Sequence, residues 1–240
     1  MLDVYADGAD YNGIIDAAMN KSIKGFTTNP TLMKAAGVTD FSKFANDIIP
    51  HLRDIRPDTN ISLEVFADDQ DEMLRQAKII AGWGDKYDYK VYVKIPVMNT
   101  QGVSNYNLVN GLVKDGINVN VTAVFTKFQV LDLLETINDD LTGSLIISIF
   151  AGRIADTLRD PEKVVKECIA LDTNRSANFL WASCREVFNY TQAYRSGCDI
   201  ITMTPDQIKK FALQNKNLME YSQETVQMFY NDAKKSGYVL

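Results

Sequence analysis

The sequence contains few of the residues from which metal sites and disulfide frameworks are built. Its 240 residues include one histidine, His51, and three widely spaced cysteines with no CxxC pair. An odd number of cysteines at this spacing argues against a disulfide framework, and the lack of a Cys/His cluster argues against a zinc site. We therefore expect no bound metal.

Positive charge and long apolar runs are also scarce. The 25 Lys and Arg residues stand against 31 Asp and Glu residues, and no basic run offsets the net charge of −6. This balance argues against nucleic acid as a partner, and an anionic ligand would need a local pocket of positive charge. No segment reaches the roughly 18 apolar residues of a membrane span, and the start, "MLDVYAD", lacks the regions of a signal peptide. We expect a cytoplasmic protein with no membrane partner.

Short β-rich runs alternate with helical patterns along the whole chain. Apolar residues recur at helical spacing in 108–113, 131–137 and 187–194, between the β-rich runs. Such alternation predicts parallel βαβ units, and eight units in 240 residues fit a closed barrel. The eight runs are residues 2–7, 23–28, 61–66, 90–95, 117–124, 144–150, 177–183 and 199–203.

The fold class that we expect is α/β, with one (β/α)8 TIM-barrel domain over residues 1–240. No low-complexity stretch or change in composition divides the chain. An open doubly wound sheet is the alternative fold. Residues 215–235 predict an additional C-terminal helix, which would pack on a neighbouring subunit or across its own barrel.

Polar residues share one face of several runs. In "INVNVTAV" (117–124), Asn118, Asn120 and Thr122 alternate with apolar residues. In a barrel the apolar face meets the surrounding helices, so the polar face points to the interior. The same alternation predicts that Cys184 packs outward. Four interior polar residues fall late in their strands, where barrel enzymes build their sites: Asp7, Glu64, Lys94 and Thr122.

Lys94 lies in the middle of "VYVKIPV" (91–97), which otherwise reads as a buried strand. A buried ammonium is costly, so its presence needs a reason. Three remain open: a free amine that attacks a carbonyl group, a structural ion pair with a carboxylate, and an edge-strand lysine that blocks aggregation.

The segment "KGFTTNPTLMKAAG" (24–37) resembles the signature of the transaldolase family, class I aldolases built on a (β/α)8 barrel. "VYVKIPVMNTQG" (91–102) is similar to the family's Schiff-base strand. The resemblance continues, in the order that the barrel requires, through "GINVNVTAVFT" (116–126), "SIFAGRIAD" (148–156) and "WASCREVFNYTQAYRSGCDIITMTPDQIKKF" (181–211).

The resemblance implies roles for ten residues. Lys94 would form the imine with the substrate, and Asp7 would be the general acid/base. Glu64 and Thr122 would hold the catalytic water. The positions matching the family's substrate contacts are Asn29 and Asn120 for hydroxyl groups, Phe150, and Arg153, Ser183 and Arg185 for phosphate.

Two of these positions separate the branches of the family. The branch that releases free dihydroxyacetone typically has Gln and Tyr where this sequence has Glu64 and Phe150, so the chain has the transferase pair. In "ADGAD" the threonine that usually follows the acid is missing. Asp7 and Asp3 therefore both stay open as the acid, and Asp7 is nearer the strand's carboxyl end.

The activity implied is a transaldolase of the pentose phosphate pathway. It would transfer a dihydroxyacetone unit, through a lysine Schiff base, from sedoheptulose 7-phosphate or fructose 6-phosphate to glyceraldehyde 3-phosphate or erythrose 4-phosphate. This chemistry needs no cofactor. An aldolase resembling fructose-6-phosphate aldolase, a biosynthetic sugar-phosphate transaldolase and a non-catalytic sugar-phosphate-binding barrel are the alternatives. We expect a homo-oligomer: a dimer, a pentamer or a decamer.

Overall fold

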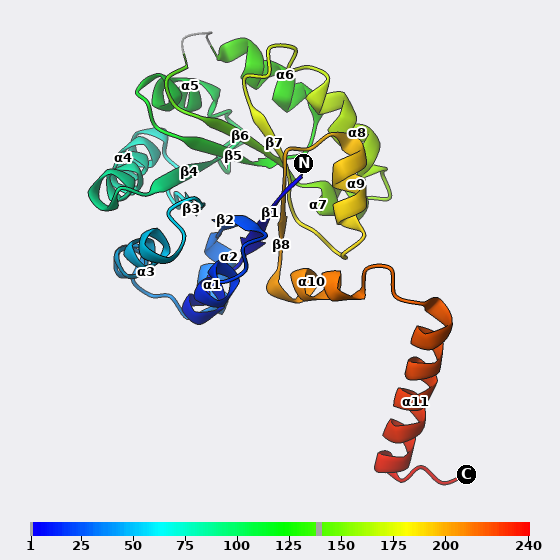
Figure 1. Ribbon diagram of the computed structural model, residues 1–240. Coiled ribbons are helices and arrows are strands. Elements are labelled where there is room, and N and C mark those ends of the chain that lie inside the picture. The colour runs from blue at the N-terminus through cyan, green and yellow to red at the C-terminus, as the bar shows by residue number, and fades with distance from the viewer. Residues whose placement is uncertain (1, 138–140) are drawn as a thin grey trace. The chain divides into compact units, whose positions relative to one another are not determined.

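A closed barrel of parallel strands forms the centre of the protein. The computed structural model describes residues 2–137 and 141–240. Within them eight strands pair in chain order, and β8 pairs with β1 (Figure 1). This confirms the (β/α)8 TIM barrel and excludes an open sheet. The strands are β1 (Asp3–Asp7), β2 (Ile23–Thr27), β3 (Asn60–Glu64), β4 (Lys90–Pro96), β5 (Val119–Val124), β6 (Leu145–Ile149), β7 (Asn178–Trp181) and β8 (Ile200–Met203).

Helices follow the strands and surround the barrel (Figure 1). The three helical patterns predicted from the sequence correspond to α5, α6 and α9. The α-helices within residues 11–209 are α1 (Tyr11–Ala18), α2 (Pro30–Ala35), α3 (Phe41–Ile55), α4 (Gln70–Tyr87), α5 (Tyr106–Lys114), α6 (Lys127–Thr136), α7 (Ala151–Ala155), α8 (Pro161–Ile169), α9 (Asn189–Ser196) and α10 (Pro205–Lys209).

Polar side chains fix where several helices begin. The Asp69 side chain accepts a hydrogen bond from Glu72 N at the start of α4. Thr126 and Gln129 form a reciprocal capping box at the start of α6. Such caps satisfy amide groups that have no partner inside the helix. The first turns therefore begin close to the carboxyl ends of the strands that precede them.

The alternation along β4 shows why the chain folds as a barrel. Val91, Val93 and Ile95 are buried on its outer side, and α4 packs against this strand. The intervening Tyr92 and Lys94 are buried on the inner side. Period-2 alternation thus places one set of residues against helices and the other inside the barrel.

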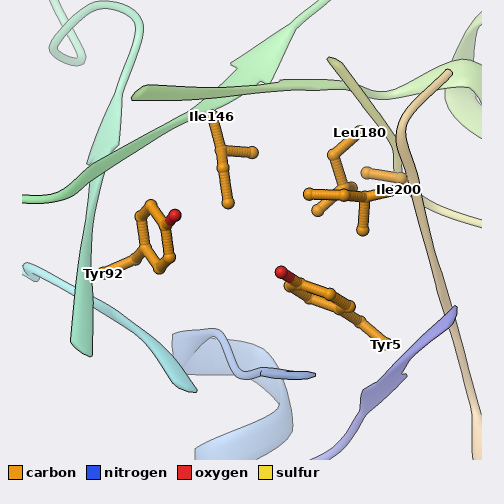
Figure 2. Packing of buried hydrophobic residues seen from close by; sticks show 6 residues of the cluster. Tyr5, Tyr92, Ile146, Leu180 and Ile200 are labelled. Carbon is orange, nitrogen blue, oxygen red and sulfur yellow. The ribbon is translucent and has the colours of Figure 1, made fainter. Parts of the chain in front are cut away.

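Six buried side chains fill the barrel below its carboxyl end, and we call them the apolar layer. Figure 2 shows five of them converging on the barrel interior from β1, β4, β6, β7 and β8. The ring of Tyr5 takes the space over Gly25, where a Cβ atom would lie 2.6 Å from the ring. The layer consists of Tyr5, Tyr92, Ile146, Leu180, Ala182 and Ile200, with Phe150 packed against it.

The chain divides into two compact units, Met1–Ile208 and Lys209–Leu240. The second contains a 3₁₀ turn and the helix α11 (Leu218–Ser236), which confirms the predicted C-terminal helix. Asn217 caps the start of α11 and Gly237, with φ 65°, ends it. None of the helices in the described residues is both long enough and apolar enough to cross a membrane.

Candidate functional site

A cavity of about 220 Å³ opens inside the barrel at the carboxyl ends of the strands. Eight of the ten predicted site residues line it, and the other two, Glu64 and Asn120, contact residues that do. The lining residues are Asp7, Thr27, Asn29, Lys94, Thr122, Ser148, Phe150, Arg153, Leu180, Ala182, Ser183, Cys184, Arg185, Thr202, Thr204 and Gln207.

Lys94 is held inside the barrel by two partners. Its side chain is on β4, between paired neighbours on both sides, and only 5% of the residue is exposed. The ammonium group lies 2.9 Å from Glu64 Oε2 and donates a hydrogen bond of 2.7 Å to the carbonyl oxygen of Thr28. A closed barrel has no edge strand, so the edge interpretation is wrong. The ion pair is present, and it leaves catalysis by the same amine open.

Asp7 is the carboxylate of β1 that reaches the cavity. It lies at the last position of the strand, whereas Asp3 lies at the first and does not line the cavity. Thr27 donates a hydrogen bond of 2.7 Å to Asp7 Oδ1. Burial raises the pKa of Asp7, and the Thr27 hydrogen bond and the charge of Lys94 oppose that rise. A raised carboxyl pKa suits a group that must both take up and return a proton.

Thr122 on β5 also lines the cavity. Within the described residues its Oγ1 atom is buried and accepts or donates no hydrogen bond. The next residue, Ala123, has φ 60°, and the pairing register between β5 and β6 shifts there. The bulge bends the end of β5 beside Thr122. An unpaired buried hydroxyl is costly, which marks this atom as a candidate ligand for water or substrate.

The two asparagines expected to bind hydroxyl groups differ in position. Asn29 lines the cavity, and its Oδ1 atom caps α2 by accepting a hydrogen bond from Leu32 N. Asn120 is fully buried and does not line the cavity. Its Nδ2 atom donates to Ser62, and its Oδ1 atom accepts a hydrogen bond of 2.6 Å from Ser148, which does line the cavity.

Two arginines lie at the rim, Arg153 in α7, which follows β6, and Arg185 in the segment after β7. Both line the cavity and both are exposed. Arg185 is paired with Asp156, whereas Arg153 has no ion pair or hydrogen bond within the described residues. The rim therefore offers the local positive charge that an anion requires on an acidic protein.

Gly152 in α7 and Ser183 after β7 bring the two rim segments together. Gly152 N donates to the Ala182 carbonyl oxygen at 3.4 Å, and a Cβ atom on Gly152 would lie 1.6 Å from the Ser183 carbonyl oxygen. Any larger residue at position 152 would push the two rim segments apart. Ser183 itself has φ 64°, an unusual conformation for a non-glycine residue that is common at functional sites.

Phe150 follows β6 and forms an apolar wall of the cavity. Its ring centroid lies 5.8 Å from that of Phe125, and the residue packs against the apolar layer. The prediction that Cys184 packs outward is wrong, because Cys184 lines the cavity. The positive φ of Ser183 breaks the strand alternation on which that prediction depended. Burial raises the pKa of Cys184 far above neutrality, so the thiol is uncharged.

Several lining residues were not singled out from the sequence. Thr27, Ser148 and Thr202 are buried polar residues on β2, β6 and β8. Each has the inward parity of its strand, which was the available signal. Ser148 in "SLIISIF" and Thr202 in "DIITM" are single polar residues among apolar neighbours. The prediction used strands in which polar and apolar residues alternate, so it did not select them.

Comparison with known proteins finds matches over most of the chain. The family model described as Transaldolase/Fructose-6-phosphate aldolase matches residues 4–239. A probable transaldolase of Hyphomonas neptunium is 31% identical over 238 residues, covering 98% of this chain and 99% of the relative. A probable transaldolase of Dehalococcoides mccartyi is 29% identical over 204 residues, covering 84% and 86%.

Solved structures at lower identity share the fold alone. KGPDC from Streptococcus mutans superposes with a TM-score of 0.56 at 13% identity, over 90% of this chain and 92% of that one. Thiamine phosphate pyrophosphorylase from Pyrococcus furiosus has a TM-score of 0.54 at 9% identity, with 85% of each chain covered. Both likenesses fit a barrel architecture that supports many chemistries.

Proposed function

Because the chain belongs to the transaldolase/fructose-6-phosphate aldolase family, we propose that it is a transaldolase that works through a Schiff base on Lys94. The observation that carries the proposal is the buried Lys94 amine, 2.9 Å from Glu64 in a cavity that Asp7 also lines. A buried lysine with a proton acceptor in contact is the arrangement that covalent catalysis through an amine requires.

The reaction would begin with loss of one proton from the Lys94 ammonium, and Glu64 is the carboxylate in contact that can take it. The neutral amine attacks the keto carbon of a ketose phosphate, and the carbinolamine loses water to give an iminium ion. The positive nitrogen then draws the electrons of the bond between the third and fourth carbons.

Asp7 would take the proton from the hydroxyl group on the fourth carbon as that bond breaks. The shortened aldose phosphate leaves, and three carbons stay on Lys94 as an enamine. An acceptor aldose phosphate then enters, the enamine attacks its aldehyde carbon, and Asp7 returns the proton. Hydrolysis of the new iminium ion releases the product and regenerates the amine.

The rest of the cavity fits this sequence of steps. The unpaired Thr122 hydroxyl and the Glu64 carboxylate can hold the one water molecule that the reaction forms and consumes. Arg153 and Arg185 supply charge-assisted donors for a phosphate group at the rim. Glu64 and Phe150 are the residues of the transferase pair, which favours transfer to an acceptor over release of free dihydroxyacetone.

Borohydride trapping tests the proposal directly. Reduction in the presence of fructose 6-phosphate should leave a stable three-carbon or six-carbon adduct on the peptide that carries Lys94, as read by mass spectrometry. Lys90, an exposed lysine of the same strand, is the internal control and should stay unmodified. An unmodified Lys94 peptide under these conditions would contradict the proposal.

Product analysis distinguishes a transferase from an aldolase. With fructose 6-phosphate alone, a transferase should stop after about one turnover per site, because the enamine has no acceptor. Addition of erythrose 4-phosphate should then restore continuous turnover, with sedoheptulose 7-phosphate and glyceraldehyde 3-phosphate as products. Continuous release of free dihydroxyacetone without an acceptor would instead assign the chain to the aldolase branch.

A further inference from the structure

Two hydroxyl groups next to Asp7 have no part in the mechanism above. Thr27 on β2 and Thr202 on β8 belong to the strands that flank β1 on either side. They are 3% and 5% exposed, respectively. Thr27 Oγ1 lies 2.7 Å from Asp7 Oδ1 and 2.5 Å from Thr202 Oγ1, so the three side chains form a continuous chain across the inside of β1.

The number of protons fixes the direction of this chain. A threonine hydroxyl group has one hydrogen, and Thr27 must donate it to Asp7 because an ionised carboxylate can only accept. Thr202 is then the donor in the contact between the two hydroxyl groups. Its hydrogen occupies the Thr27 oxygen and leaves the Thr27 hydrogen directed at Asp7.

The other charged groups around Asp7 do not orient it. Lys94 and Glu64 act on it through charge alone and in opposite directions. Arg153 and Arg185 lie at the rim of the same cavity, and the nearby Cys184 thiol is neutral. Within the described residues the Asp7 carboxylate has one hydrogen bond, the bond from Thr27 to Oδ1. Oδ2 is therefore the oxygen left to exchange a proton.

We propose that Thr202 is a positioning residue, which acts through Thr27 to orient the Asp7 carboxyl group so that Oδ2 faces the substrate. This inference rests on the proposed function only in assigning proton transfer to Asp7. Chains of hydrogen bonds polarise one another, so loss of the Thr202 donor weakens the bond from Thr27 to the carboxylate. A weaker bond to the charged form favours the protonated form.

A titration of Asp7 in the intact protein tests the proposal without turnover. The carboxyl carbon is followed by NMR in protein labelled with ¹³C at aspartate, and Asp7→Asn identifies its resonance. Thr27→Val should raise the midpoint by about one pH unit, and Thr202→Val should raise it by about half a unit. Thr202→Ser keeps the hydroxyl group and should restore the wild-type midpoint.

The control is Thr59→Val, which removes a buried hydroxyl group that contacts Arg56 and Tyr89 instead of Asp7. It should lower stability and leave the Asp7 midpoint unchanged. The acidic limb of kcat/KM should move with the midpoint in Thr202→Val. Thr202→Ala gives a second route to the same measurement if the valine variant does not fold.

An unchanged Asp7 midpoint in Thr202→Val or Thr202→Ala, beside a raised midpoint in Thr27→Val, would overturn the role of Thr202. Such a result would leave the proposed function intact if Lys94 is still trapped by borohydride. Conversely, a failure to trap Lys94 beside a raised midpoint would overturn the function and keep the hydrogen-bond chain. The two hypotheses therefore fail separately.

Discussion

The apolar layer and the polar lining of the cavity come from the same strands, two residues apart. Tyr5 precedes Asp7 on β1, and Tyr92 precedes Lys94 on β4. The first residue of each pair closes the barrel to water from below, and the second carries charge or hydrogen-bonding groups. A dry floor strengthens every electrostatic interaction above it, so the apolar layer is part of the reason that the lining can work.

The largest expected effect is in the polar lining. Lys94→Met keeps most of the volume and removes the amine, so the proposed mechanism predicts a loss of kcat of at least about a thousandfold and no borohydride adduct. Lys90→Met removes an exposed lysine from the same strand and is the matched control. Steady-state transfer kinetics measure both. Retention of more than a tenth of the activity in Lys94→Met would mean that the polar lining does not supply the reacting amine.

In the apolar layer the large effect should fall on stability. Ile146 faces the barrel interior on β6 and is fully buried, so Ile146→Ala should cost about 2 to 5 kcal/mol of the free energy of unfolding. Urea denaturation measures this cost. The folded variant should also lose activity a few-fold, because the space left by the Ile146 side chain lies directly below the active-site cavity.

The neighbouring residue sharpens this expectation. Ile147 is equally buried but has the opposite parity, so it faces the helices. Ile147→Ala should cost a similar free energy of unfolding and leave kcat unchanged. Equal losses of activity in the two variants would show that the layer supports the fold without tuning the site.

The tyrosines of the apolar layer offer a smaller test. The Tyr5 hydroxyl oxygen accepts a hydrogen bond of 2.8 Å from Asn60 Nδ2, whereas the Tyr92 hydroxyl has no hydrogen bond within the described residues. Tyr5→Phe leaves a buried amide poorly paired and should cost about 1 to 3 kcal/mol of unfolding free energy. Tyr92→Phe should cost less. Thermal unfolding of both variants would compare them, and equal costs would contradict this account.

The arrangement of the strands was predictable from the sequence, because period-2 alternation and strand–helix spacing determine it locally. The inward positions of Asp7, Lys94 and Thr122 followed from the same rule. The partner of each inward residue was not predictable. Thr27 lies opposite Asp7, and Thr202 opposite Tyr5, only because of the pairing registers around β1, which depend on the closed barrel as a whole.

The orientation of side chains could not be predicted where the backbone leaves the extended conformation. Parity holds only while the chain is extended, and the positive φ at Ser183 turned Cys184 into the cavity against expectation. The burial of Asn120 behind Ser148 is a related case. Its residue type and parity suit a ligand contact, but its depth in the barrel depends on strand tilt, which a local pattern does not specify.

The smallest expected effect is on the pH dependence of stability, and it concerns Asp7, whose charge lies directly above the apolar layer. Burial raises its pKa in the folded protein above the value of 3.8 for a free carboxyl group. The folded state therefore binds the proton more tightly than the unfolded chain, and the stability linked to Asp7 is greatest below that value. It is lost as the pH rises through the folded pKa.

Asp7→Asn removes this penalty and can still accept the hydrogen bond from Thr27. At pH 7 we expect its Tm to exceed that of the wild type by a few degrees, and the gain should shrink to nothing below about pH 4. Asp16→Asn removes the same charge from an exposed site on α1 and should show no such pH dependence. Calorimetry across this range tests the expectation. A gain independent of pH would show that it does not come from the Asp7 charge, and a loss at pH 7 would mean that the surroundings stabilise this charge.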